Sequence, residues 1–238
     1  MSLNSQRILI VGGSSGIGLE TARLAAQRGA EVLIAGRNPE RLRVAGQSVG
    51  MGVQGMEADF TDEASVARLM DRAGRIDHLV LAASINPALG QFREVGLDAL
   101  RRAFEGKLFG YWACAQRALP VLRLDGSVTM LAGAASRVGV PGTAGVAAVN
   151  GAITQMAQTL AKELAPLRVN VVSPGMIDTP AFDGMPAGQR QAMFDHAAAA
   201  VSSKRIGRVA EIADAVMFLI GNGFTTGALL DVDGGARA

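Results

Sequence analysis

The stretch Ile8-Leu-Ile-Val-Gly-Gly-Ser-Ser-Gly-Ile-Gly18 decides the fold, because it joins a short apolar run to a glycine-rich turn. A helical pattern over 19–28 follows directly, so the order is strand, turn, helix. Gly12 permits the tight turn, Gly16 permits close approach of the backbone to a pyrophosphate, and Gly18 permits close packing of helix on strand. The stretch therefore predicts a dinucleotide-binding unit.

The helix that leaves this turn supports the same interpretation. Its first N–H groups and the positive end of its dipole would face the phosphates. Ser14 and Ser15 add hydroxyl donors to the turn. A glycine-rich turn alone is a weak signal, but its place between a strand and a helix makes it far more specific.

Strand-like and helix-like segments alternate along the rest of the chain. The predicted strands are 8–11, 31–36, 53–59, 77–83, 126–132, 168–173 and 228–233. The predicted helices are 19–28, 39–49, 61–74, 97–124, 143–164, one within 180–203, and 209–221. Regular alternation predicts an α/β, Rossmann-type, doubly wound, seven-stranded parallel sheet with helices on both faces. We expect a single dinucleotide-binding domain over 1–238.

Composition narrows the classes of protein that remain. Of 238 residues, 49% are hydrophobic and 18% are charged, at a formal net charge of +2, so a large core can be buried. Scattered basic residues and 4% aromatic content argue against a nucleic-acid partner. No apolar stretch predicts a membrane span, and no signal peptide is expected before the first strand. Cys114 is the only cysteine, so the default location is cytoplasmic, and no spacing predicts a metal site.

The residues after the second predicted strand bear on cofactor choice. An acidic residue there accepts hydrogen bonds from the adenosine ribose hydroxyls and favours NAD. This chain has Gly36-Arg37, which offers space and a permanent planar cation for a 2′-phosphate. NADP(H) is therefore favoured over NAD(H). The alternative is a solvated arginine at the end of a strand.

These motifs together resemble the short-chain dehydrogenase/reductase family over 7–235. Gly12, Gly16 and Gly18 match its nucleotide turn, and Asp59 matches the acid that contacts adenine. The segment 168–179 matches its sixth strand and the loop that touches nicotinamide, and 226–235 matches its C-terminal signature. The resemblance implies these cofactor contacts: Gly12, Ser14, Ser15, Gly16, Ile17, Gly18, Arg37, Asp59, Phe60, Ala82, Ala83, Asn150, Pro174, Gly175, Ile177 and Thr179. It also implies a small-molecule substrate and a homodimer or homotetramer, with which the apolar helices containing Cys114 and Ile153 are compatible.

The chemistry of the family does not carry over in the same way. Its usual machinery is Asn, Ser, Tyr and Lys, in which the tyrosine exchanges the proton and the lysine lowers the tyrosine pKa. The matching positions here are Lys107, Gly133, Val146 and Asn150. We therefore expect an NADP(H)-dependent oxidoreductase that acts on a carbonyl or alcohol with a non-standard proton donor. The alternative is a catalytically inactive NADP(H)-binding sensor or scaffold.

Lys107 and Tyr111 are the candidate catalytic residues. They lie four positions apart on one predicted helix, and so on one face. Partial desolvation and the cationic nicotinamide would lower the pKa of Lys107 towards the range of acid–base work. The alternatives are that Lys107 is a strut bonded to backbone carbonyls and that Tyr111 packs between helices. Asn150 is expected to bond the nicotinamide ribose.

Other polar residues have simpler interpretations. Ser84, Ser136 and Thr143 are expected to cap loops, and His78 to be structural or solvated. His196 lies in the segment 181–203, which covers the substrate in relatives, and is a candidate substrate contact. Residues near this segment suggest an apolar pocket, although helical packing explains some of them equally well: Met176, Phe182, Met185, Met193 and Phe194.

Overall fold

A seven-stranded parallel sheet forms the centre of the molecule, which a computed structural model describes over residues 2–50, 52–84 and 88–237. The strand order is β3-β2-β1-β4-β5-β6-β9, and every pairing in it is parallel. The strands are β1 Arg7–Val11, β2 Glu31–Gly36, β3 Val53–Glu57, β4 Ile76–Leu81, β5 Leu122–Leu131, β6 Arg168–Pro174 and β9 Leu229–Val232. The predicted fold class is confirmed.

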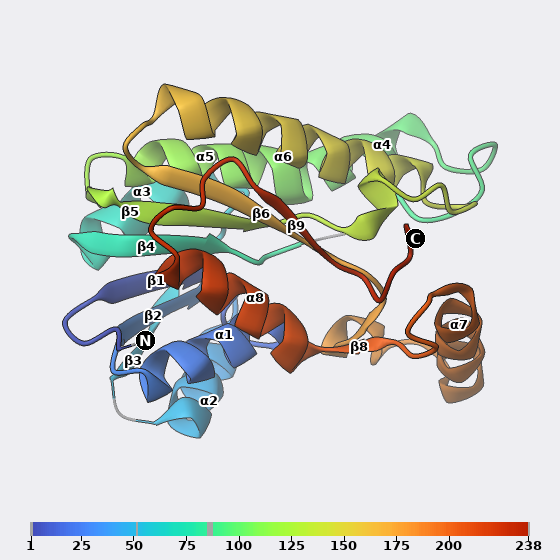
Figure 1. Cartoon of the computed structure of the whole chain (residues 1–238), viewed down its shortest axis with the longest axis horizontal. Coiled ribbons are helices and arrows are strands. Elements are labelled where there is room, and N and C mark those ends of the chain that lie inside the picture. The colour runs from blue at the N-terminus through green and yellow to red at the C-terminus, as the bar shows by residue number, and fades with distance from the viewer. Residues whose placement is uncertain (1, 51, 85–87, 238) are drawn as a thin grey trace.

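Helices cover both faces of this sheet (Figure 1). The α-helices are α1 Gly16–Gln27, α2 Pro39–Val49, α3 Glu63–Ala73, α4 Leu97–Ala103, α5 Gly110–Ala118, α6 Ala144–Glu163, α7 Ala187–Ala200 and α8 Val209–Gly221. One apolar cluster lies between the sheet and α3, α5 and α6, and a second lies between the sheet and α1, α2 and α8. Burial on both faces explains why the strands are almost continuously apolar.

Local signals set several boundaries. Asn38 caps α2 by accepting a hydrogen bond from the Arg41 N–H, and Pro39 occupies the first turn. Asp62 caps α3 in the same way, through Ala64 and Ser65. The predicted bounds of β2, α2 and α8 are those observed. Where capping residues and glycines mark the ends of elements, the sequence predicts the element boundaries accurately.

The long helix predicted over 97–124 is wrong at its C-terminal end. Helix α5 ends at Ala118, and Leu122 already pairs with Ile76 at the start of β5. Pro120 explains the stop, because it lacks the N–H donor that would continue the helical hydrogen bonds. Within the predicted helix, Phe104–Phe109 forms a π-helical turn, η1, between α4 and α5.

The strand order reverses beside β1, whose neighbours are β2 on one side and β4 on the other. Open parallel sheets bind ligands at such a point, beyond the carboxyl ends of the strands. A small two-stranded sheet, β7 Ile177–Asp178 with β8 Gly207–Arg208, lies apart from the main sheet and was not predicted. Helix α7 stands beyond the main sheet next to this pair (Figure 1). Among the described residues, no helix has the length and apolarity that crossing a membrane requires.

Candidate active site

The turn after β1 has the geometry that its glycines predict. Gly12 has a φ of +88°, and a Cβ atom there would lie 2.5 Å from the backbone nitrogen of Ala83. A Cβ atom on Gly18 would lie 2.2 Å from the carbonyl oxygen of Gly12. The N–H of Ala82 donates to the carbonyl of Val11 at 2.9 Å, so the loop after β4 lies against the turn. Side chains larger than hydrogen are therefore excluded at Gly12 and Gly18.

The N-terminus of α1 is equipped for an anion. Ser15 is its N-cap residue, in an extended conformation, and its side chain caps no backbone N–H. The first turn of α1 contains no acidic residue. The first N–H groups and the helix dipole therefore remain for a phosphate. A dinucleotide fits this turn, with Ser14, Ser15 and Ile17 beside it.

The predicted adenosine end assembles from the ends of β2 and β3. A Cβ atom on Gly36 would lie 3.5 Å from Ser14 Oγ, so the turn lies directly beside the residue before Arg37. Arg37 is exposed and has no ion-pair partner within the described chain. The Asp59 carboxylate accepts hydrogen bonds from Thr61, through N–H at 2.9 Å and Oγ1 at 2.7 Å. These contacts order the loop in which Asp59 lies.

Phe60 takes a different position from the other predicted contacts. Its side chain is 6% exposed and belongs to the apolar cluster under α5. A Cβ atom on Gly110 would lie 2.2 Å from the Phe60 ring. The ring therefore packs in the core, and only the backbone of Phe60 is left for the cofactor contact that the sequence predicts.

The predicted nicotinamide end follows β6. The nearest atoms to a Cβ built on Gly16 belong to Thr179 and Pro180, at 3.7 Å, so this loop meets the glycine-rich turn. Gly175 packs against Asp233, and its N–H donates to the carbonyl of Val232 at 3.0 Å. Ile177 is buried, and its pairing with Gly207 joins this loop to the segment that precedes α8. The loop from Pro174 to Thr179 is therefore firmly positioned.

Lys107 is buried at the carboxyl end of β5, with 5% of its surface exposed. Its Nζ donates to the carbonyl of Ala132 at 3.0 Å and to Asn150 Oδ1 at 2.8 Å. Burial lowers its pKa to about 7, from an ordinary value of 10.5. Lys107 lies in the π-helical turn η1, a type of turn that recurs at functional sites. Lys107 therefore makes the predicted hydrogen bond to a backbone carbonyl and also has a pKa suited to acid–base catalysis.

The family resemblance places Lys107 and Asn150 at exchanged positions. The resemblance assigns lysine to position 150 and asparagine to position 107, and the two side chains here are in direct contact. On this alignment an ammonium group lies where the family's lysine would place one, but its side chain extends from η1 and not from α6. Val146, at the position of the family's tyrosine, is half-buried on the same helix and has no group that exchanges protons.

Tyr111 is fully buried within the apolar cluster. Its hydroxyl has no hydrogen-bond partner among the described residues. Burial raises its pKa well above the ordinary value, so the phenol is neutral. The packing alternative is thus observed, and the catalytic role of Tyr111 stays a prediction.

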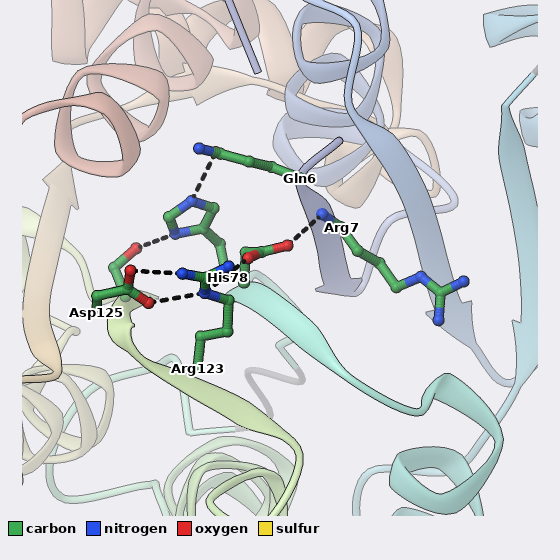
Figure 2. A network of polar contacts seen from close by, with 7 residues as sticks. Gln6, Arg7, His78, Arg123 and Asp125 are labelled. Atoms are coloured by element: carbon green, nitrogen blue, oxygen red, sulfur yellow. Dashed lines mark hydrogen bonds and ion pairs between the residues drawn. The ribbon is translucent and has the colours of Figure 1, made fainter. Parts of the chain in front are cut away.

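His78 lies at the other end of the sheet, near the start of β4. Its Nδ1 is 2.8 Å from Ser127 Oγ and its Nε2 is 3.0 Å from Gln6 Oε1 (Figure 2). Arg123 binds Asp125 through two hydrogen bonds beside it (Figure 2). His78 is 5% exposed, so it is structural and not solvated. It is not part of the candidate active site.

The remaining predicted residues divide into loop and surface positions. Ser136 Oγ donates to the Gly133 carbonyl, and Thr143 Oγ1 donates to the Val140 carbonyl, so both close loops as predicted. His196 is exposed on α7. Its contact with substrate stays a prediction.

The structure accounts for some of the apolar residues named for the predicted pocket. Phe182 and Phe194 pack edge to face at 5.5 Å, so helical packing explains these two. A cavity of about 130 Å³ lies between the loop after β6, α7 and the C-terminal segment. Of the five apolar side chains named from the sequence, Met176 alone lines it.

Comparison with known proteins decides the family. The sequence model of the family described as "Enoyl-(Acyl carrier protein) reductase" matches residues 11–237. The chain belongs to the short-chain dehydrogenase/reductase family. Cis-4-hydroxycyclohexanecarboxylate dehydrogenase of Sinomonas cyclohexanicum is 35% identical, over 98% of each chain. Carbonyl reductase family member 4 of Danio rerio is 32% identical, also over 98% of each chain.

A solved structure supports the same assignment. A small-chain dehydrogenase in complex with NADPH is 34% identical, with a TM-score of 0.86, over 98% of this chain and 99% of that one. This short-chain dehydrogenase/reductase is therefore an NAD(P)-dependent oxidoreductase that acts on a small molecule.

Sequence reasoning missed two features of the site. It did not foresee that Lys107 and Asn150 bond to each other, although the exchanged residue types at two family positions were a usable signal. It also assigned no role to Gly133 beyond a missing serine. The reason for that glycine lies in the side chain of Asn150, described below.

Proposed function

We propose that this enzyme interconverts a carbonyl compound and its alcohol with NADP(H), and that Lys107 supplies or accepts the proton. The observation that carries the proposal is the buried ammonium of Lys107, bonded to Ala132 at the end of β5. That end adjoins Gly133, the position from which the family contacts the substrate oxygen. No other lysine shares this setting, because Lys162 and Lys204 lie on the surface.

The bound nicotinamide would supply or accept the hydride. Lys107 has three N–H bonds when protonated, and two of them are directed at Ala132 and Asn150. The third is left for the substrate oxygen, directly or through water. In reduction the ammonium gives up this proton, and in oxidation the neutral amine takes it. A pKa of about 7 makes both forms available near neutral pH.

The preference for NADP(H) rests on Arg37 and Gly36. Arg37 is an exposed guanidinium without an ion-pair partner in the described chain, next to a glycine that leaves room for a phosphate. Ser14 lies beside Gly36 and adds a hydroxyl. Together they form a binding surface for a 2′-phosphate.

The assembly is proposed to be a homodimer or homotetramer. The helices that contain Cys114 and Ile153 are compatible with such an assembly, although these two side chains are themselves fully buried within the protomer. Phe109 and Trp112 are more than half exposed at the start of α5 and offer an apolar contact instead. A cytoplasmic location stays a prediction.

The test is turnover of NADPH with a broad panel of ketones and aldehydes, followed by loss of absorbance. We expect wild-type turnover and a fall in kcat of about 100-fold or more in Lys107→Ala, as for loss of a general acid. Lys162→Ala is the matched control and should behave as wild type. Ethylamine, added to Lys107→Ala, should restore part of the activity.

Two results would overturn the proposal at different points. Tight NADPH binding without turnover of any compound by the wild type would contradict an enzymatic role on carbonyls. Full turnover in Lys107→Ala would leave the reaction class intact and remove Lys107 as the proton donor.

A further inference from the structure

The side-chain amide of Asn150 has a defined orientation. In its ammonium form Lys107 has donors only, so the amide atom that faces its Nζ at 2.8 Å is then the oxygen. The NH2 group therefore faces the opposite way. The ammonium thus removes the usual ambiguity between the two ends of an asparagine amide.

The NH2 group of Asn150 points at Gly133. A Cβ atom built on Gly133 would lie 2.8 Å from Asn150 Nδ2, against 3.9 Å from Oδ1. A contact under 3.0 Å leaves no room for a side chain at position 133 unless Asn150 moves. The Gly133 backbone is extended, with a φ of 172°, so glycine is not required by its conformation. The glycine is explained by the amide that fills its side-chain space.

Nδ2 is also a donor in need of an acceptor. Asn150 is 3% exposed, and Nδ2 makes no hydrogen bond within the described chain. Nδ2 is not among the solvent-inaccessible atoms that lack a partner, so an oxygen from solvent or from a ligand can reach it. Such a donor, facing the end of β5 next to half-buried Val146, is placed to bind an oxygen that arrives with a ligand.

We propose that the Asn150 amide donates a hydrogen bond from Nδ2 to the substrate oxygen, and that Lys107 holds the amide in the orientation this requires. This inference rests on the proposed function. The amide replaces the serine hydroxyl that relatives present from position 133. Lys107 and Asn150 then form one unit, in which the first moves the proton and the second polarises the oxygen.

The competing assignment is the ribose contact that the sequence predicts for Asn150. The two assignments differ in what Asn150→Ala changes. A ribose contact predicts weaker NADPH binding. A substrate-oxygen contact predicts unchanged NADPH affinity, within about threefold, and a fall in kcat of about 10² to 10³, as for loss of one oxyanion donor.

Rescue from position 133 gives the sharper experiment. In the Asn150→Ala background the space beside Gly133 is vacated, so Gly133→Ser would place a hydroxyl where Nδ2 was. We expect this double variant to recover at least tenfold in kcat. Gly133→Ala in the same background fills the same space without a donor and should recover nothing. Thermal unfolding and NADPH titration confirm that each variant is folded and loaded.

A second readout does not depend on turnover. The side-chain NH2 resonances of Asn150, assigned by their loss in Asn150→Ala, should shift when a ketone reduced by the wild type is added to the NADP⁺-loaded protein. The inference is overturned if the Gly133→Ser and Gly133→Ala variants in the Asn150→Ala background are equally active. It is also overturned if the NH2 resonances do not shift when the ketone is added. An inactive wild type would instead overturn the proposed function on which it rests.

Discussion

The ammonium of Lys107 donates a 2.8 Å hydrogen bond to the side-chain oxygen of Asn150, 43 positions away in the sequence. The family resemblance assigns the asparagine to the position of Lys107 and the lysine to the position of Asn150. The exchange keeps a cation beside the end of β5 while the tyrosine position carries Val146. Under the proposed function, proton transfer therefore depends on the pKa of Lys107 itself.

The pH dependence of turnover should follow the pKa of Lys107, which burial lowers to about 7. Reduction needs the ammonium form, so its kcat should be highest below pH 7 and fall as the pH rises through 7. Oxidation needs the neutral amine, so its kcat should rise over the same interval. Rate profiles in both directions measure this. Two profiles that move in the same direction would contradict proton exchange by Lys107.

Arg37→Ala should separate the two nicotinamide cofactors. Loss of a charge-assisted contact to the 2′-phosphate should weaken NADPH binding by about tenfold to 100-fold, while NADH affinity changes by less than about threefold. Fluorescence titration of both cofactors measures the ratio. Arg72→Ala, on α3, is the matched control for general charge effects. Equal losses for NADPH and NADH would remove Arg37 from the phosphate site.

His78 should make the protein sensitive to acid. Its pKa is lowered to about 4, mainly by burial and further by the positive charge of Arg168. The neutral form is therefore favoured by folding, and this contribution is complete above pH 6.5, the ordinary pKa. It is lost as the pH falls from 6.5 to 4, at a cost of roughly 3 kcal/mol in the free energy of unfolding.

Urea unfolding at several pH values measures this loss. His78→Gln should flatten the dependence between pH 6.5 and 4, whereas His196→Gln, at an exposed histidine, should retain it. A wild type that is equally stable at pH 7 and pH 4.5 would show that His78 does not control acid stability.

Tyr111→Phe tests the second predicted catalytic residue. The hydroxyl is buried without a partner, so its removal should leave the free energy of unfolding unchanged or raise it by up to about 1 kcal/mol. Stability is measured by thermal unfolding and kcat by NADPH oxidation. A tenfold fall in kcat at unchanged NADPH affinity would support the predicted role. Unchanged kcat would assign Tyr111 to packing alone.

The sequence predicted the fold almost completely, because its signals are local. Apolar runs end at glycines, and caps such as Asn38 precede helices, so β2 and α2 have the predicted bounds. The prediction of a helix over 97–124 was wrong near Pro120, where the apolar pattern continues but the backbone cannot continue the helix. The π-helical turn leaves no local pattern and was not foreseen.

Within the candidate site, the sequence predicted where contiguous motifs lie better than which distant side chains meet. The glycine-rich turn and the loop from Pro174 to Thr179 are contiguous motifs, so each was found from the sequence. Lys107 was found because a family position pointed to it. Its contacts with Ala132 and Asn150 join segments distant in sequence, and the orientation of the amide follows only once their atoms are placed.

The π-helical turn at Phe104–Phe109 lets one continuous helix pack against a different neighbouring helix on each side of the turn. Each residue of an α-helix turns the face by 100°, so the wider turn puts the parts on either side out of phase. Accordingly α4 and η1 contact α6, while α5 contacts α3. The position of the Lys107 ammonium and the packing of α5 against α3 therefore both depend on the number of residues in this turn. Inserting or deleting one residue in this turn would therefore change both at once, whereas a substitution leaves the residue count unchanged.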